Sequence, residues 1–338
     1  MSKKLNFAVV GCGRMGLRRI GTIRSHPKAD LRCVEDYNPE IARKVAEEVG
    51  CDWYSGWQDM VSRPDVDCVT VSVPNKFHHD VAIAALEAGK HVFCEKPLAR
   101  NPGEAIAMVE AAQRSGNFLK VGSNLRYFPS VLKAKELLDS GKIGKTLFAR
   151  GWIGHSGWNL GTWYSEPEII GGGTLLDNGC HLLDLYRWFL GEVKSCVGFT
   201  STTLQLIGPL EDNAMAIFKF QDGKMAFLHS SWTEWAGYMY LEVYGTEGFI
   251  RIDNRGQSCI TTIGTKDGQQ KVLDYSQEPP KSYILEFDDY VNAILNNRQP
   301  LPSGFDGLRA VQMAHAVYQS ALLGREVKIG GDIESNRV

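Results

Sequence analysis

Short apolar runs alternate with helical patterns through the first third of this chain, and that alternation constrains the fold more than any other feature. Five runs with strand character occur at residues 6–10, 31–37, 67–74, 90–97 and 118–123, and a stretch with helical spacing follows each of the first four. Strands separated by helices favour right-handed crossovers, which bring the strands side by side in one parallel sheet. The pattern predicts an α/β fold whose N-terminal domain contains a doubly wound parallel sheet.

The pattern changes near residue 123. Eight strand-like runs lie between residues 145 and 276, with turn signals such as Asp222-Gly223 between them, and one predicted helix at about residues 174–190 interrupts the series. Strands joined by short turns favour antiparallel pairing. We therefore expect a first domain of residues 1–123 and a second, α/β domain of residues 124–338 on an open, mostly antiparallel sheet, with C-terminal helices that can pack back on the first domain.

Composition narrows the class of protein. The chain has 338 residues, 43% of them hydrophobic and 22% charged, and a formal net charge of −2, which is typical of a soluble globular protein with two domains. This balance gives no reason to expect nucleic acid or a membrane as a partner. Eight cysteines are scattered without a C-x-x-C pair, which predicts packed, reduced thiols, no metal site and a cytoplasmic protein. No apolar segment reaches the length of a signal sequence or a membrane span.

The first motif with chemistry in it is G-x-G-x-x-G at Gly11, Gly13 and Gly16, with Arg14 and Met15 inside it, after the first strand and at the start of a helix. The first glycine permits a tight turn, the second lets the backbone approach a pyrophosphate, and the third allows close packing of helix on strand. The helix N-terminus then faces the phosphate charge. The strand before the motif and the helix after it favour dinucleotide binding over a plain glycine turn.

Asp36 supports the same conclusion, because it ends the second strand about twenty residues beyond the last glycine. An acid at this point accepts hydrogen bonds from the adenosine ribose and repels a 2′-phosphate. Neither Tyr37 nor Asn38 supplies the cation that a 2′-phosphate needs. We predict NAD as the cofactor, and NADP stays open because three arginines lie nearby, Arg14, Arg18 and Arg19.

The stretch Cys94-Glu95-Lys96-Pro97 ends another strand of the first domain. An ordinary strand exit also places charge and then proline here, so the stretch alone allows either a surface charge or a lysine held for chemistry. The carboxyl ends of the strands line the ligand crevice of a doubly wound sheet. That position places Lys96 in the crevice.

Several motifs together resemble the Gfo/Idh/MocA family, named for glucose-fructose oxidoreductase and inositol dehydrogenase. Beside the glycine motif they are Pro74-Asn75-x-x-His78, Ala88-Gly89-Lys90-His91-Val92-x-x-Glu95-Lys96-Pro97 and Gly171-Gly172-Gly173-x-x-x-Asp177-x-x-x-His181. The resemblance implies an NAD(P)-dependent oxidoreductase that interconverts a hydroxyl and a ketone on a sugar, cyclic polyol or nucleotide-linked sugar. It implies a Rossmann domain followed by an α/β domain, and a cis Lys96-Pro97 peptide.

The resemblance also implies cofactor contacts from the strand ends of the first domain: Pro74, Asn75, His78, Glu95 and Lys96. For two of these the plain alternatives are a capping asparagine at Asn75 and a surface histidine at His78.

Asp177 and His181 are four apart on the predicted helix, so their side chains share a face. A carboxylate beside an imidazole orients it and favours its protonated form, which suits a base that takes a hydroxyl proton, while Lys96 would hold the reacting oxygen. By itself His181 would more often be a core histidine satisfied by Asp177 or Asp184, and the glycine run with the family pattern reverses that preference. The same fold also serves regulators that sense a dinucleotide without turnover; the presence of Lys96, Asp177 and His181 together favours an enzyme.

Other candidates lie near the domain junction and in the second domain. Asn124 and Arg126 would bind a substrate hydroxyl or carboxylate, or else act as hinge residues that pair with the second domain. Aromatic residues crowd the loop before the predicted helix: Trp152, Trp158, Trp163 and Tyr164. Trp163 is the candidate to stack on a sugar, although aromatic residues near strands more often pack in the sheet. Tyr283 resembles a family tyrosine that reaches the cofactor cleft.

The sheet of the second domain raises the question of assembly. Too few helices follow residue 145 to cover both of its faces. We expect one face to meet another subunit in a homodimer or homotetramer, as the resemblance also implies.

Overall fold

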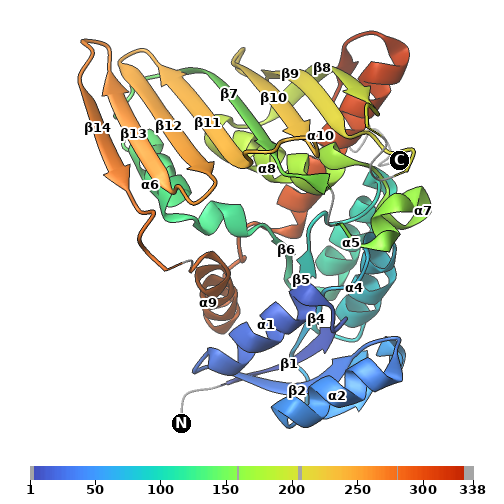
Figure 1. Cartoon of the computed structure of the whole chain (residues 1–338). Coiled ribbons are helices and arrows are strands. Elements are labelled where there is room, and N and C mark those ends of the chain that lie inside the picture. The colour runs from blue at the N-terminus through green and yellow to red at the C-terminus, as the bar shows by residue number, and fades with distance from the viewer. Residues whose placement is uncertain (1–3, 158–159, 205–207, 280, 331–338) are drawn as a thin grey trace. The chain divides into compact units, whose positions relative to one another are not determined.

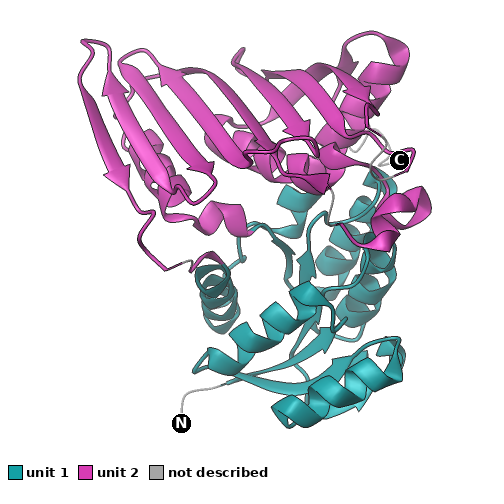
Figure 2. Ribbon diagram, viewed as in Figure 1, with its two compact units in different colours: residues 1–123, 283–308 teal, residues 124–282, 309–338 magenta. Residues whose placement is uncertain are grey.

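The computed structural model describes residues 4–157, 160–204, 208–279 and 281–330. Trp158, one of the aromatic candidates, lies outside the described residues. The chain forms two compact units, one of residues 1–123 and 283–308 and the other of residues 124–282 and 309–338 (Figure 2).

Unit 1 contains a six-stranded, all-parallel sheet in the order β3-β2-β1-β4-β5-β6 (Figure 1). Its strands are β1 (Leu5–Val10), β2 (Ala29–Glu35), β3 (Asp52–Tyr54), β4 (Cys68–Val71), β5 (His91–Glu95) and β6 (Leu119–Gly122). The predicted doubly wound parallel sheet is confirmed. β3 was not predicted, because three residues are too few to show a pattern. The strand order reverses between β1 and β4, where such sheets bind their ligand.

Seven helical segments lie wholly or mainly in the described part of unit 1: α1 (Arg14–Ser25), α2 (Pro39–Val49), α3 (Trp57–Val61), η1 (Asn75–Phe77), α4 (His78–Glu87), α5 (Pro102–Ser115) and α9 (Ser282–Leu295). α9 comes from the far end of the chain and completes the core. The ring of Phe287 lies 5.1 Å from that of Phe7, and the ring of Tyr290 lies 5.3 Å from that of Phe93, measured between centroids. All four side chains are buried, so α9 is part of this core.

Local signals set the ends of α2 and α5. The side chains of Asn38 and Asn101 accept hydrogen bonds from backbone N–H groups of the first turn, and proline follows each of them. Gly50 and Gly116 end the same helices in the left-handed conformation that glycine adopts most easily.

Unit 2 contains a nine-stranded sheet in the order β14-β13-β12-β11-β7-β10-β9-β8-β15. Its strands are β7 (Thr146–Gly154), β8 (Val193–Ser201), β9 (Asn213–Phe220), β10 (Met225–Ser231), β11 (Tyr238–Gly245), β12 (Gly248–Arg255), β13 (Ile260–Thr265), β14 (Gln270–Asp274) and β15 (Val327–Lys328). Only β7 and β10 pair in parallel among these strands, so the mostly antiparallel sheet is confirmed. The two-residue β15 was not predicted.

The helical segments of unit 2 are η2 (Asn124–Tyr127), α6 (Pro129–Asp139), η4 (Thr162–Ser165), α7 (Pro167–Ile170), η5 (Leu175–Gly179), α8 (Cys180–Leu190) and α10 (Gly304–Leu323), which begins in unit 1. α6, α8 and α10 lie on one face of the sheet (Figure 1). A single α-helix over residues 174–190 was expected; instead η5 is a π-helical turn that leads into α8. α6 was not predicted.

The other face of this sheet exposes large apolar side chains from neighbouring strands: Phe199, Met215, Ile217, Met225 and Phe227. Among the described helices, none is long and apolar enough to cross a membrane.

Candidate functional site

The glycine turn after β1 has the geometry of a diphosphate cradle. Gly11 has φ +92°, and a Cβ on Gly16 would lie 1.8 Å from the carbonyl oxygen of Gly11. Only glycine therefore lets α1 approach β1 so closely. A Cβ on Gly13 would meet none of the described atoms within 4 Å, apart from those of its own neighbours. The backbone at Gly13 thus faces open space at the start of α1, which fits a pyrophosphate.

Asp36 lies directly beside this turn. Its Oδ2 accepts a hydrogen bond from the backbone N–H of Cys12 at 2.9 Å, and its Oδ1 accepts one from Asn38 at 3.0 Å. Each carboxylate oxygen can accept more than one hydrogen bond. The carboxylate is therefore held in place and can still accept from a ribose hydroxyl.

Arg19 is committed elsewhere and cannot serve a 2′-phosphate. It is 1% exposed, its Nε lies 2.6 Å from Glu95 Oε1, and its Nη1 lies 2.9 Å from Glu286 Oε2. The Nζ of Lys120 lies 3.9 Å from Glu286 Oε1. We call these four residues the buried charge cluster. It ties Glu95 of the Glu-Lys-Pro motif to α1 and α9, and a Cβ on Gly122 would crowd it at 3.0 Å from Glu95 Oε2.

Two other arginines stay near the turn. Arg14 is exposed, and the guanidinium of Arg18 lies 4.5 Å from the ring centroid of Tyr283. Tyr283, from the start of α9, therefore contacts the helix that begins at the glycine turn.

His78 connects two strand ends of the crevice. It is 1% exposed, and its ring nitrogens lie 2.9 Å from the carbonyl oxygens of Pro97 and Val73. Burial lowers the pKa of His78, although these hydrogen bonds act in the opposite direction. The alternative of a surface histidine is wrong. The ring supports the Lys96-Pro97 peptide, which is cis as expected, and Lys96 itself is half-buried. Asn75, 4% exposed, begins η1 beside it.

Unit 2 carries the carboxylate and the imidazole of the family pattern. Asp177 in η5 and His181 in α8 are 5% and 4% exposed. The indole N–H of the fully buried Trp232 donates to Asp177 Oδ2 at 3.3 Å. Trp232 follows β10 and was missed, because a tryptophan at the end of an apolar strand indicates packing. π-helical turns are rare in proteins, and those that occur are often found at functional sites.

Arg126 and Asp184 form a buried ion pair. The Nε and Nη2 atoms of Arg126 lie 2.8 and 2.6 Å from the two carboxylate oxygens of Asp184. The alternative to substrate binding was that Arg126 pairs with a residue of the second domain, and Asp184 is such a residue. A substrate contact by Arg126 stays a prediction. The Nδ2 of Asn124 donates to Ser282 Oγ at 3.1 Å.

The aromatic candidates separate into two groups. Trp152 stacks on Tyr240 of the adjacent strand at 4.3 Å between centroids, which is packing within the sheet. The ring centroids of Trp163 and Tyr164 lie 4.1 Å apart, and both side chains pack against the cluster that contains Trp232. Stacking of Trp163 on a sugar stays a prediction.

The cysteine beside His181 is buried and makes a local hydrogen bond. The Sγ of Cys180 donates to the carbonyl oxygen of Asp177 at 3.1 Å. Over the described residues, no group of three or more His, Cys, Asp or Glu side chains could hold a metal ion.

Comparison with known proteins agrees with both units. Residues 5–123 match the model of the oxidoreductase family with an NAD-binding Rossmann fold, and residues 131–251 match the GFO/IDH/MocA C-terminal domain. The chain is 28% identical over 340 residues to scyllo-inositol 2-dehydrogenase (NAD(+)) of Bacillus subtilis, with 97% of each protein covered. It is 32% identical over 276 residues to 2,7-anhydro-N-acetylneuraminate hydratase of Escherichia coli, which covers 79% of this chain and 72% of that protein.

Among solved structures, a levoglucosan dehydrogenase in complex with NADH and levoglucosan matches with a TM-score of 0.88 and 26% identity, over 97% of this chain and 100% of the other. The glycine cradle, the Asp36 carboxylate and these matches agree on NAD as the cofactor. The chain belongs to the Gfo/Idh/MocA family of oxidoreductases with an NAD-binding Rossmann fold.

Proposed function

We propose that this protein is an NAD-dependent dehydrogenase or reductase that interconverts a secondary hydroxyl and a ketone on a sugar or cyclic polyol. The observation that carries the proposal is the buried pair Asp177 and His181 on one helical segment of unit 2, in a chain whose unit 1 holds the glycine cradle and Asp36. A dinucleotide sensor needs the cradle but not a buried carboxylate and imidazole together with Lys96.

Each residue has one task in this proposal. When NAD is bound, its nicotinamide supplies the hydride acceptor or donor. His181 takes the hydroxyl proton, Asp177 orients the His181 ring, and Lys96 holds the reacting oxygen and favours its deprotonated form. The support for joining Lys96 with the other two is the sequence pattern that contains all three. In the reverse direction the same groups return the proton to a ketone oxygen.

The names of the relatives guide the choice of substrates. Those relatives include dehydrogenases named for scyllo-inositol, myo-inositol and levoglucosan, and a reductase named for 1,5-anhydro-D-fructose. One relative is named as a hydratase of an anhydro sugar. A screen should therefore hold inositols, levoglucosan, other anhydro sugars and nucleotide-linked sugars.

The test is a screen of the purified protein with NAD or NADH against this panel, followed by absorbance of the reduced nicotinamide. Lys96→Met and His181→Ala should each lower kcat on the best substrate by roughly 10² to 10⁴, the range typical of losing one acid–base or oxyanion-type contact. The affinity for NAD should change far less. The double variant should lose much less than the product of the two single losses, since both groups serve one proton transfer. No turnover with any substrate would favour a dinucleotide sensor instead.

Assembly and location are part of the same proposal. The open face of the unit 2 sheet, with Phe199, Ile217 and Phe227 exposed, fits a contact with a second copy in a homodimer or homotetramer. Light scattering at micromolar concentration should give at least twice the mass of the chain, and a monomeric mass would contradict this. None of the eight cysteines, all of which lie among the described residues, is in a disulfide, which supports a cytoplasmic location.

A further inference from the structure

Three consecutive backbone amides at the start of the helical segment that carries Asp177 converge on one residue. Glu211 accepts hydrogen bonds from Gly173 N–H through Oε2 at 2.8 Å and from Leu175 N–H through Oε1 at 3.1 Å. Its own carbonyl oxygen accepts from Thr174 N–H at 3.0 Å. The first amides of a helix have no partner within the helix, and a carboxylate is the group that the helix dipole favours there. Glu211 therefore fixes where this segment begins.

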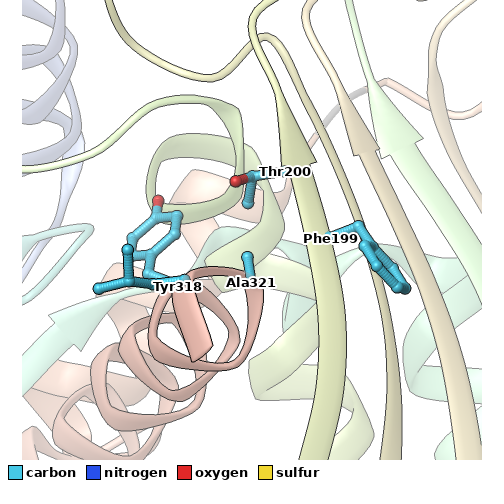
Figure 3. Close-up of a pocket in the computed structure, with 5 residues that line it drawn as sticks. Phe199, Thr200, Tyr318 and Ala321 are labelled. Atoms are coloured by element: carbon cyan, nitrogen blue, oxygen red, sulfur yellow. The ribbon is translucent and has the colours of Figure 1, made fainter. Parts of the chain in front are cut away.

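A second residue holds Glu211 in place. The hydroxyl of Tyr318, from α10, donates to Glu211 Oε1 at 2.8 Å. Burial raises the pKa of Tyr318 well above its usual value, and the neighbouring Glu211 raises it further, so the hydroxyl stays protonated and donates. Figure 3 shows the Tyr318 ring beside Ala321 on α10, where both line a surface pocket. A change of Tyr318 to phenylalanine would keep the ring in that pocket and remove only the hydroxyl.

The glycines before the helix are explained by these two partners. A Cβ on Gly173 would lie 2.1 Å from the carbonyl oxygen of Glu211 and 2.5 Å from its Oε2. A Cβ on Gly172 would lie 2.6 Å from the Tyr318 hydroxyl. Any larger residue would move the helix start away from Glu211.

Two routes of contacts connect Glu211 and its neighbour Asp212 to Asp177. Along the backbone, Asp177 N–H donates to the carbonyl oxygen of Gly173 at 3.0 Å, and Gly173 is the residue that Glu211 holds. The second route starts at the backbone of Asp212: the backbone N–H of Trp232 donates to the carbonyl oxygen of Asp212 at 2.8 Å, and the Trp232 indole donates to the Asp177 carboxylate. Two adjacent residues, Glu211 and Asp212, thus fix both the backbone and the carboxylate of Asp177.

We propose that Glu211, supported by Tyr318, is a positioning residue that sets the orientation of Asp177 and His181 for proton transfer. The inference rests on the proposed function, since it gives these two side chains a role in the reaction. Glu211 is not a catalytic residue, because it acts on the helix start and through it on Asp177.

The central variant is Glu211→Gln. Glutamine keeps the size and one acceptor oxygen, but its NH₂ group must face one of the donors that the carboxylate now accepts. We expect kcat to fall by about 10- to 100-fold, as for a displacement of about 1 Å in a catalytic group. The KM for NAD should stay within about twofold, because the glycine cradle is untouched. Tyr318→Phe should lower kcat by about fivefold, less than Glu211→Gln, because it removes one of the hydrogen bonds that hold Glu211 and leaves the carboxylate in place.

The matched control is Glu326→Gln in the same unit. Like Glu211, Glu326 accepts a hydrogen bond from a hydroxyl, that of Ser195 at 2.5 Å. Its other partner is Lys219 at 3.0 Å, where Glu211 has backbone amides, and Glu326 is exposed at the sheet edge. This control should leave kcat unchanged. A stability role alone would lower the active fraction in Glu211→Gln without moving the pH dependence of kcat. A positioning role moves the apparent pKa in that profile, because the environment of His181 changes.

Hydrogen exchange gives a readout without turnover. The segment of residues 173–181 should exchange faster in Glu211→Gln than in the unmodified protein, while β12 and β13 should not change. Unchanged exchange in that segment, or an active protein whose Glu211→Gln variant keeps its kcat and pH profile, would overturn this inference and leave the proposed function intact. An unmodified protein that turns over no substrate would overturn the proposed function and this role of Glu211 with it.

Discussion

The buried charge cluster allows a prediction worked directly from its contacts. Arg19→Met would remove the guanidinium that lies 2.6 Å from Glu95 and 2.9 Å from Glu286, both in the interior of unit 1. Methionine fills much of the aliphatic volume of arginine, so the main loss is electrostatic. The unmodified cluster has two positive and two negative charges; the variant has one against two. Removing one partner of a buried ion pair costs about 3 to 5 kcal/mol of the free energy of unfolding.

The loss should depend on pH in a defined direction. Burial raises the pKa of Glu286, and Arg19 opposes that rise, so its removal raises the pKa further. When the pKa of a carboxyl is higher in the folded than in the unfolded state, the group stabilises the fold at any pH below its unfolded-state pKa. That contribution is lost as the pH rises through its folded-state pKa. The deficit of Arg19→Met should therefore be largest near neutral pH and smaller near pH 5.

Urea unfolding followed by circular dichroism at two pH values measures this deficit. Arg63→Met is the control in the same unit, because Arg63 pairs with the exposed carboxylates of Asp52 and Asp65 and should cost less than about 1 kcal/mol. The double variant Arg19→Met with Glu286→Gln should lose less than the sum of its parts, since it restores the charge balance. A deficit below 1 kcal/mol at neutral pH, or one that does not change with pH, would refute the reasoning.

Three further outcomes are expected. Asp36→Ala should narrow the preference for NAD over NADP in binding titrations; equal dissociation constants in the unmodified protein would contradict the role of Asp36. Burial, with a smaller contribution from Asp36, raises the pKa of Glu35 to about 7; stability should therefore fall as the pH rises from 5 to 8, and Glu35→Gln should flatten that slope in thermal melts. Trp232→Phe should lower kcat by about tenfold through the loss of its hydrogen bond to Asp177, with NAD affinity unchanged in the same titrations.

The sequence predicted what depends on local pattern. Runs of apolar residues and the turns between them predict the parallel sheet of unit 1 and the eight strands β7 to β14. Each such run shows the residue spacing of a strand within a short stretch of sequence, so no distant contact is needed to recognise it. The short strands β3 and β15 have too few residues for a pattern. The π-helical turn at Leu175–Gly179 was missed because nothing in a helical period distinguishes a wider turn.

What the sequence could not supply is the identity of partners far apart in the chain. The position of Arg19 near the glycine turn leaves a phosphate contact open, yet its ion-pair partners are Glu95 and Glu286, and Glu286 is on α9 near the other end of the chain. An arginine in the first helix gives no sign of which carboxylate it will meet. Only the return of α9 to the core of unit 1 decides that.

The three glycines before the Asp177 helix show how a pattern and its cause can separate. In the sequence they were part of a family motif, which indicates a function without explaining the residue type. In the structure Gly172 and Gly173 are the positions where a side chain would collide with Tyr318 and Glu211. Glu211 belongs to no sequence motif. Its role follows only from the hydrogen bonds that it accepts from the backbone N–H groups of Gly173 and Leu175. The glycines at this helix start therefore mark the places where Tyr318 and Glu211 approach the backbone, and these two residues hold the segment that carries Asp177.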